Sequence, residues 1–316
     1  MSVKIGTENV LINSNKKSTW KIFWNQRVLF LFLLPAVVLA IIFNYIPMVG
    51  LVMAFENYKV QHGFFGSEFV GFAHFAKFLK DPEFYRALKN TIGISILKII
   101  FEFPAPIILA ILLDEVKKMK FRRVFQTITY LPHFVSWIIV ATMVYRMLDP
   151  YSGIVNIIIQ AFGGQPVEFM REGKYFWGIL IATGIWKEIG WNSIIYLAAI
   201  SGINPELYSA AMVDGAGKFR RIIHITLPGI MPTVALIFVL NLGSLVHTNF
   251  DAVFNLMNPL IQTSAEVIDT YVFRTGIQLA RYSYATAIGL TQSVISIILV
   301  FVGFKFANKI NNYTII

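Results

Sequence analysis

The 316-residue sequence contains no cysteine, which excludes disulfide bonds and thiol chemistry. It is also poor in charge. Asp, Glu, Lys and Arg make up 14% of the chain, whereas soluble domains carry about 25%. Hydrophobic residues make up 56%, and the mean hydropathy is +0.65. This composition predicts an integral membrane protein.

Several motifs are missing too. The sequence has no Gly-x-x-x-x-Gly-Lys-[Ser/Thr] phosphate loop, so we expect no nucleotide to bind to this chain itself. The five histidines are scattered without metal-ligand spacing, and no Ser-His-Asp arrangement can be argued, so neither a metal site nor a catalytic centre has support. The net charge of +10 is accompanied by no nucleic-acid motif. We therefore expect no nucleic-acid partner, and we assign the charge to the membrane surface.

Long apolar segments dominate the rest of the chain. A bilayer-spanning helix needs roughly 20 apolar residues, and six segments are long enough. The sequence therefore predicts an all-α polytopic membrane protein with six transmembrane helices, at Val28–Ala54, Asn90–Leu113, Val124–Leu148, Phe176–Ile200, Gly229–Phe250 and Tyr284–Phe306.

These spans divide the chain into three parts. Residues 1–27 form a cytoplasmic N-terminal segment whose aromatic and basic residues suggest a short interfacial helix. That segment has no apolar core or small-residue cleavage site, so we expect that it is not a signal peptide. Residues 28–306 form the transmembrane domain, which contains a cytoplasmic loop at 201–228, and residues 307–316 form a cytoplasmic tail.

The distribution of positive charge predicts the orientation. With the N-terminus inside, the inner segments hold 15 Lys and Arg residues and the outer segments nine, while three lie within spans. The positive-inside rule therefore favours both termini in the cytoplasm. The outer loop 55–89 contains Phe64, Phe65, Phe69, Phe72, Phe75 and Phe78 with Gly63, Gly66 and Gly71 between them, which suggests a folded cap. The outer segment 251–283 contains a probable short helix, Ala265–Leu279, interpreted as a half-buried gate element.

The polar, basic loop 201–228 has its own start and stop signals. Asn204 is a good helix N-cap and Pro205 suits the first helical position. Asp214-Gly215 is a turn signal, and Pro228 is expected to end the element. Tyr208, Met212, Gly215 and Phe219 fall near one face at helical spacing. An amphipathic helix on the lipid surface is the plain alternative to a docking element.

The same loop resembles the cytoplasmic "EAA" loop of ABC importer permeases. In that family an acidic-Ala-Ala triplet is followed by Gly and, nine residues later, by Ile-x-Leu-Pro. Here Ala210-Ala211 precede Gly215, and Ile225-Thr226-Leu227-Pro228 completes the pattern, although Ser209 stands where the family usually has Glu.

Other segments are similar to the oligosaccharide and polysaccharide branch of the carbohydrate permeases. They are residues 266–276 and 282–290, Lys89-Asn90-Thr91 and Tyr130-Leu131-Pro132. The resemblance covers roughly residues 25–312. It implies the type I ABC importer permease architecture in a bacterial cell membrane, and an importer for an oligosaccharide or polysaccharide fragment.

The resemblance also implies partners. They are a second permease subunit, expected to be a paralogue, two ATPase subunits that hold ATP and Mg, an extracytoplasmic solute-binding protein, a carbohydrate substrate and the lipid bilayer. No cofactor is expected on this chain. The residues expected at the ATPase interface are Tyr208, Ser209, Ala210, Ala211, Asp214, Gly215, Ala216 and Phe219.

Polar residues within the spans are candidates for a substrate path, because polar groups in a membrane are costly and are by default functional. The alternative is hydrogen bonding that merely joins helices, worth about 0.6 kcal/mol per contact. Lys98 and Glu102, at i and i+4, are interpreted as neutralising each other, and Pro104 and Pro106 are expected to kink their helix. The path candidates are Glu188, Trp191, Asn192, Tyr196, Asn241, Ser244, Thr248 and Gln292.

Two other classes of protein compete with this interpretation. An ion-coupled secondary sugar transporter would require inverted repeats, paired broken helices and a membrane-embedded acidic site. Only Glu102 and Glu188 qualify as such acids, and the loop at 201–228 would have no explanation. A membrane enzyme would require a catalytic cluster, which the sequence does not offer.

Overall fold

The computed structural model describes residues 26–311, apart from the side chains of Phe65, Phe306 and residues 308–311. Its contacts divide the chain into two units, residues 1–52 and 53–316. The predicted interfacial helix lies outside the described residues. The division at residue 52 falls inside the first predicted span, so the predicted domain borders stay predictions.

The first unit contains α2 (Arg27–Ala40), the π-helical turn η1 (Ile41–Tyr45) and the start of the 3₁₀ segment η2 (Ile46–Phe55). The second unit begins with a small antiparallel hairpin, in which β1 (Glu56–Asn57) pairs with β2 (Glu68–Phe69), Glu56 opposite Phe69. The other described residues of this unit are helical or irregular. The helices are α3 (Gly63–Gly66), α4 (Ala73–Phe78), α5 (Pro82–Leu97), η3 (Lys98–Glu102), α6 (Pro104–Asp114), α7 (Met119–Tyr130), η4 (Leu131–Phe134), α8 (Trp137–Met147), α9 (Ile154–Ala161), η5 (Gly173–Tyr175), α10 (Phe176–Ser201), α11 (Pro205–Val213), α12 (Lys218–Arg221), η6 (Ile222–Thr226), α13 (Leu227–Gly243), α14 (Phe250–Leu256), α15 (Gln262–Ala265), α16 (Ile268–Phe273), η7 (Arg274–Gln278) and α17 (Tyr282–Asn311).

Within the described part of the chain, four helical stretches are long and apolar enough to cross a membrane: Arg27–Phe55, Pro82–Asp114, Lys218–Gly243 and Tyr282–Lys305. A bent pair, α7–η4 with α8, raises the number to five if it counts as one span. At 26 residues α10 is long enough for a bilayer core of about 30 Å, but its charged and amide side chains make it less apolar than the four. The count of six spans stays a prediction.

The third predicted span, Val124–Leu148, is wrong as one continuous helix. The chain turns by 102° between α7–η4 and α8. Pro132 lies in the 3₁₀ turn η4, and Val135 and Ser136 both have extended backbone, so the helical hydrogen bonds stop there. Proline lacks the N–H that would continue the ladder. We call residues 131–136 the elbow.

The fifth predicted span, Gly229–Phe250, has both ends in the wrong place. One helical stretch runs from Lys218 to Gly243, so it begins inside the predicted loop and passes through Pro228, which was expected to end that loop. Its other end comes at Gly243, because residues 244–249 are irregular.

Three of the long helices pass a proline in the same way. A π-helical turn ends two residues before Pro47, before Pro104 and before Pro228, at η1, η3 and η6 respectively. The ring of a proline clashes with the carbonyl four residues earlier, and a π-turn widens the helix at that point. The wider turn explains why these prolines do not terminate their helices.

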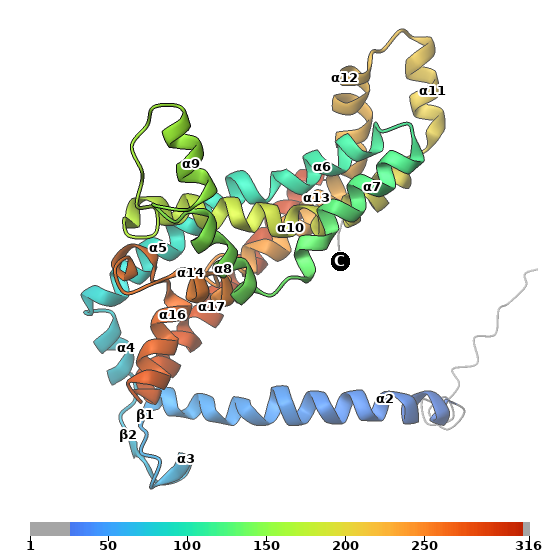
Figure 1. Ribbon diagram of the computed structural model, residues 1–316. Coiled ribbons are helices and arrows are strands. Elements are labelled where there is room, and N and C mark those ends of the chain that lie inside the picture. The colour runs from blue at the N-terminus through green and yellow to red at the C-terminus, as the bar shows by residue number, and fades with distance from the viewer. Residues whose placement is uncertain (1–25, 312–316) are drawn as a thin grey trace, which may run out of the picture. The chain divides into compact units, whose positions relative to one another are not determined.

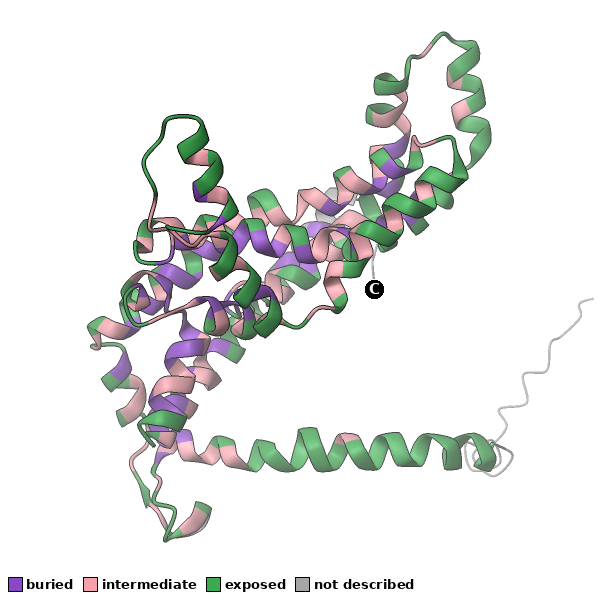
Figure 2. Cartoon of the chain, viewed as in Figure 1, coloured by how far each residue is buried: buried purple, intermediate pink, exposed green. Residues whose placement is uncertain are grey.

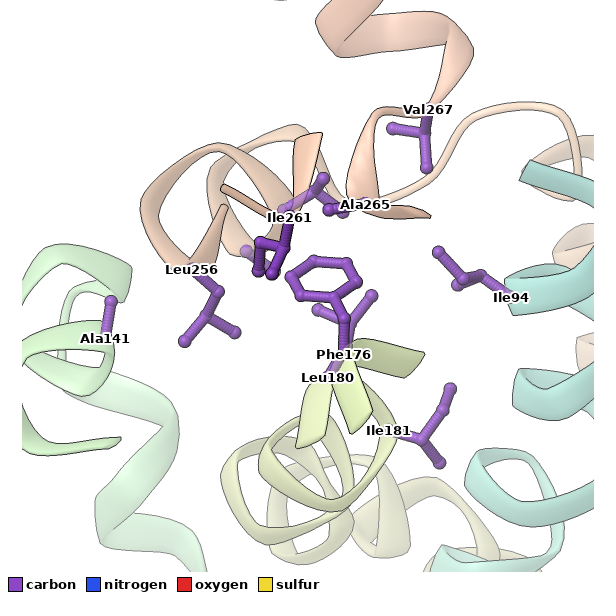
Figure 3. Close-up of a cluster of buried hydrophobic side chains, with 11 residues drawn as sticks. Ile94, Ala141, Phe176, Leu180, Ile181, Leu256, Ile261, Ala265 and Val267 are labelled. Atoms are coloured by element: carbon purple, nitrogen blue, oxygen red, sulfur yellow. The ribbon is translucent and has the colours of Figure 1, made fainter. Parts of the chain in front are cut away.

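The core of the second unit joins segments that are far apart in the sequence. Figure 3 shows Phe176, Leu180 and Ile181 of α10 facing Ile94 of α5, Leu256 of α14 and the segment from Ile261 to Val267. Trp177 donates from its indole N–H to the Ser264 carbonyl at 2.9 Å. A second cluster of buried residues joins α6, α10 and α13 (Ala110, Leu113, Tyr196, Leu197, Ile200 and Ile230).

The outward faces of the helices are apolar. On the helix from Pro82 to Asp114 the exposed residues include Ile92, Ile96 and Ile100 at four-residue spacing, and Ile108 and Leu112 further along. An extended apolar surface of this kind is rare on a soluble monomer, and it suits lipid. Within the second unit, α11 and α12 lie at one end, and α4 and α16 lie at the other (Figures 1 and 2).

The predicted cap in loop 55–89 is confirmed as a folded element. Phe55 contacts Phe72 and Phe75, and the aromatic contacts continue through Phe78 to Phe84 at centroid distances of 4.8–6.1 Å. Further along the chain, the predicted helix Ala265–Leu279 is replaced by α16 and η7, which begin three residues later, after extended backbone at Glu266 and Val267.

Asp81 joins this cap to two helices. Its Oδ1 caps α5 by accepting the Glu83 N–H at 2.9 Å. Its Oδ2 accepts the hydroxyls of Tyr284 at 2.7 Å and Tyr271 at 2.9 Å. Burial raises the pKa of the Asp81 carboxyl, but the hydrogen bonds from Tyr284, the Glu83 N–H and Tyr271 outweigh burial and hold the pKa below its ordinary value.

We expect Asp81→Asn to lower the melting temperature of the detergent-purified protein at neutral pH, by the equivalent of about 1 kcal/mol. A carboxyl whose pKa is depressed by folding stabilises the fold above its unfolded pKa of about 3.9, and this contribution is lost as the pH falls through the folded pKa. The difference between the two proteins should therefore shrink below about pH 4. Glu68→Gln, on the exposed hairpin strand, is the control. A difference that does not change with pH would contradict this account.

Candidate functional site: a docking loop and a polar cavity

The loop after α10 forms a helix with defined ends. Asn204 caps α11, since its Oδ1 accepts the Glu206 N–H at 2.9 Å, and Pro205 takes the first helical position, as predicted. The helix stops at Val213, and Gly215 follows with φ +75°. The predicted turn at Asp214-Gly215 is therefore confirmed.

The hydrogen bonds at this turn explain why glycine stands there. The Ala216 N–H donates to the Ala211 carbonyl at 2.8 Å, and the Gly215 N–H donates to the Met212 carbonyl at 3.1 Å. This pair of bonds is a Schellman motif, whose left-handed residue is usually glycine. A Cβ added at Gly215 would meet nothing within 4 Å, so only the backbone conformation disfavours other residues.

The single helical face predicted for this loop is wrong. Tyr208 and Met212 lie on α11, but Gly215 ends that helix and Phe219 belongs to α12. The Tyr208 hydroxyl forms a hydrogen bond with the hydroxyl of Thr226 at 3.0 Å. Thr226 is buried, so the tip of the Tyr208 side chain points away from the exposed end of the loop.

Most of the predicted docking residues lie at the surface. Ser209, Ala210, Asp214, Gly215 and Phe219 are exposed, while Tyr208, Ala211 and Ala216 are half-buried. The Ser209 hydroxyl donates to the Pro205 carbonyl at 3.2 Å, within its own helix. The loop also exposes two large apolar side chains that were not predicted, Leu207 and Val213, although their apolar character in a polar loop is visible in the sequence.

A polar cavity of about 220 Å³ lies among α5–η3–α6, α10 and α13. Four of the predicted path residues line it: Asn192 and Tyr196 from α10, Asn241 from the end of α13, and Ser244 just beyond. Neither Asn192 nor Asn241 has a side-chain hydrogen-bond partner among residues 26–311, so both amides are available to a ligand.

The cavity also contains charged groups that the sequence analysis did not assign to the path. Lys98 and Glu102 line it from the π-turn η3, with Nζ and Oε2 3.9 Å apart. The ion pair between them was predicted. Glu102 Oε2 has no hydrogen-bond partner in the described part of the chain. Gly184 of α10 makes room for this carboxylate, which would lie 3.3 Å from a Cβ at that position. His247 lines the cavity too.

Two other path candidates, Gln292 and Thr248, make hydrogen bonds that fix the irregular segment 244–249, and they do not face the cavity. Gln292 donates to the Val246 carbonyl and to Asp269 Oδ1, the latter at 2.8 Å. Thr248 donates to Asp269 Oδ2 at 3.3 Å. Both side chains are buried, and neither belongs to the lining of the cavity.

The last two candidates, Glu188 and Trp191, also lie away from this cavity. The Glu188 carboxylate contacts His133 Nδ1 at 2.7 Å and Lys187 Nζ at 3.2 Å. The Trp191 indole stacks on the His133 ring at 4.4 Å between centroids. The spacing of Glu188 and Trp191 on α10 could not predict these contacts, because their partner His133 lies more than 50 residues earlier in the chain.

Comparison with known proteins identifies the family. Residues 102–311 match the model of the binding-protein-dependent transport system inner membrane component. The chain belongs to this family. It is a multi-pass membrane protein and a transport component rather than an enzyme, and its family does not support the ion-coupled alternative. Membership implies a partner permease, ATPase subunits and a solute-binding protein.

Two relatives from Bacillus subtilis (strain 168) are similar over most of their length. Protein LplB is 42% identical over 273 residues, which cover 86% of each chain. The polygalacturonan/rhamnogalacturonan transport system permease protein YteP is 39% identical over 284 residues, which cover 90% of this chain and 88% of YteP.

A solved structure confirms the all-α permease fold. It is the crystal structure of a bacterial alginate ABC transporter in complex with alginate pentasaccharide-bound periplasmic protein. One of its chains is 40% identical to this one with a TM-score of 0.86, and the match covers 93% of this chain and 99% of that chain.

The cavity gives a direct test of the path candidates, because the chain has no cysteine of its own. We expect Asn192→Cys and Asn241→Cys to react with a hydrophilic thiol reagent in the intact complex, since their side chains line the cavity. Thr248→Cys should stay unreactive in the same conditions, because Thr248 is buried and does not line the cavity. Labelling is followed by mass spectrometry. If both asparagine positions are inert in every state of the transport cycle, the path lies elsewhere.

Proposed function

We propose that this chain is a transmembrane permease subunit of an ATP-driven, binding-protein-dependent importer for an oligosaccharide or a polysaccharide fragment. The observation that carries the proposal is the combination of a docking loop at one end of the helices with a polar cavity between them. The loop leads directly into two helices that line the cavity, α10 and α13. YteP and the alginate transporter support a saccharide substrate.

The chemistry of the cavity suits a saccharide. Amide side chains both donate and accept hydrogen bonds, as sugar hydroxyls do, and Asn192, Asn241 and Ser244 supply such groups. A transport path must also release its substrate, so a few hydrogen bonds and one aromatic side chain, Tyr196, are sufficient. We place Asn192, Tyr196, Asn241 and Ser244 on the path.

The docking loop fits an ATPase partner. Its tip presents small residues and exposed apolar side chains at a turn fixed by Gly215, and this arrangement suits insertion into a groove of another protein. We propose that ATP and Mg are held by two such ATPase subunits and that this chain binds no cofactor. The second permease is proposed to be a paralogue, and both chain termini are proposed to lie in the cytoplasm.

The first test uses the purified proteins in nanodiscs. We expect no ATP hydrolysis from this chain alone, because it lacks a phosphate loop. The complex with its partners should hydrolyse ATP faster when the binding protein is loaded with saccharide. Robust hydrolysis by the isolated chain, or a complete complex that ignores every saccharide-loaded binding protein, would contradict the proposal.

The second test concerns the turn at Gly215. Placing a non-glycine residue in the left-handed conformation costs about 1–2 kcal/mol, so Gly215→Ala should weaken coupling between saccharide binding and ATP hydrolysis several-fold. Gly215→Asn should do less harm, because Asn tolerates this conformation. Gly215→Trp should abolish coupling, since it also adds bulk at the docking tip.

Gly217→Ala is the matched control, because Gly217 has φ −66° and equally open space around its Cβ position. Ser209→Ala should also have little effect, since its hydroxyl is bonded inside α11. Insertion in the membrane is checked by purified yield. Unchanged saccharide-stimulated ATPase activity in Gly215→Trp would refute the assignment of this loop as the docking element.

A further inference from the structure

The elbow between α7 and α8 interrupts a helix that faces the membrane. Backbone groups that leave a helix at membrane depth need new partners, because lipid offers none. The elbow lies against the middle of α10, at Lys187, Glu188 and Trp191, and its contacts with these residues are made by His133 and Phe134.

His133 is held from three sides. Lys187 Nζ donates to the His133 carbonyl at 2.6 Å. The His133 Nδ1 is 2.7 Å from Glu188 Oε2. The imidazole lies parallel to the Trp191 indole, with an interplanar angle of 1°, and Phe134 packs edge-on against the same indole. We call His133, Lys187 and Glu188 the elbow clamp.

Lys187 is the unusual member of the elbow clamp. It is 4% exposed, although lysine is almost never fully buried unless it is paired. Its ammonium group is 3.2 Å from Glu188 Oε1 and lies 5.6 Å from the centre of the Trp137 ring. Removing these partners would leave an uncompensated charge inside the protein, which is strongly destabilising. The three residues of the elbow clamp are therefore more stable in contact with one another than apart.

The backbones of α7 and α10 are also in close contact beside the clamp. A Cβ at Gly190 would lie 2.0 Å from the Thr129 carbonyl oxygen. Beyond the elbow the contacts change: α8 packs on α14, and the Tyr145 hydroxyl donates to the Leu256 carbonyl at 3.0 Å. The elbow thus separates α7, which packs on α10, from α8, which packs mainly on α14 and contacts Lys187 of α10 through Trp137 at its start.

We propose that Lys187, Glu188 and His133 are positioning residues for transport. They keep α7 fixed to α10 throughout the transport cycle, so the two helices move as one body when the docking loop moves. The chain then flexes at Val135 and Ser136, where the backbone is already extended. This inference rests on the proposed function, because α10 carries Asn192 and Tyr196 of the cavity and continues into the docking loop.

The first experiment compares two substitutions of Lys187 in the reconstituted complex. Lys187→Met keeps the length of the side chain but removes its charge and its hydrogen bond. We expect saccharide taken up per ATP hydrolysed to fall by about tenfold, while basal ATP hydrolysis persists because the docking loop is untouched. Lys187→Arg, which keeps a charged donor, should recover much of the coupling. Lys174→Met, at an exposed ion pair, is the control.

The second experiment replaces the clamp by a covalent bond. In this cysteine-free chain, His133→Cys with Glu188→Cys removes two members of the clamp and should uncouple uptake from ATP hydrolysis. A short bifunctional thiol reagent that contains a reducible bond should link the two positions, because the native side chains meet at 2.7 Å and the reagent spans the gap left by the shorter cysteines. Coupling should return in the linked protein and disappear again when the reagent is cleaved by reduction.

This rescue distinguishes a fixed clamp from the alternatives. A latch that opens in each cycle would be blocked by the link, and a proton relay through His133 and Glu188 would not be restored by it. Failure of the link to form, or a linked protein that stays uncoupled, would overturn the inference. The proposed function is judged separately, by saccharide uptake in the unmodified complex, so its failure cannot be confused with failure of the clamp.

Discussion

Every polar backbone group of a membrane protein must find its partner inside the protein, because lipid supplies none. Two departures from regular helix in this structure meet that requirement with specific side chains. Ser95 and Gln292 bond the Leu245 and Val246 carbonyls in the segment after α13, and Lys187 bonds the His133 carbonyl at the elbow. Gln292 and Lys187, both buried, therefore support irregular backbone and do not line the cavity.

At three prolines the helical backbone is adjusted by a change of turn and not by a side chain. A π-turn ends two residues before each of Pro47, Pro104 and Pro228, and the helix continues beyond. One of these turns, η3, also places Lys98 and Glu102 at the cavity. Accommodation of a proline and presentation of charged groups thus occur in a single turn, which agrees with the frequent occurrence of π-turns at functional sites.

The sequence predicted features that depend on neighbouring residues. The cap by Asn204, the turn at Gly215, the pair Lys98–Glu102 and the aromatic cap all follow from local spacing, and the structure contains each of them. Composition was sufficient for the membrane class, and the motif around Gly215 for the family. Four cavity residues were also identified, because polar side chains at helical spacing on two helices suggested a common face.

Features that depend on distant residues escaped prediction. The elbow requires His133 to meet Lys187 and Glu188, and the end of α13 at Gly243 requires Ser95 and Gln292 to bond the segment that follows. Hydropathy in that segment continues through Phe250, so an apolar pattern alone indicated a longer helix. For the same reason Glu188, Thr248 and Gln292 resembled path residues: their polarity in a membrane is visible in sequence, but their partners are not.

The helix from Lys218 to Gly243 has a mechanical consequence. Its first residues belong to the docking loop, and Asn241 near its other end lines the cavity, so about 35 Å of helix joins the two at 1.5 Å per residue. On a rod of that length a tilt of about ten degrees about one end displaces the other by about 6 Å. A displacement of that size is comparable to the width of a sugar ring. Small rotations imposed at the loop are therefore geometrically amplified at the cavity, and no change in secondary structure is required between them.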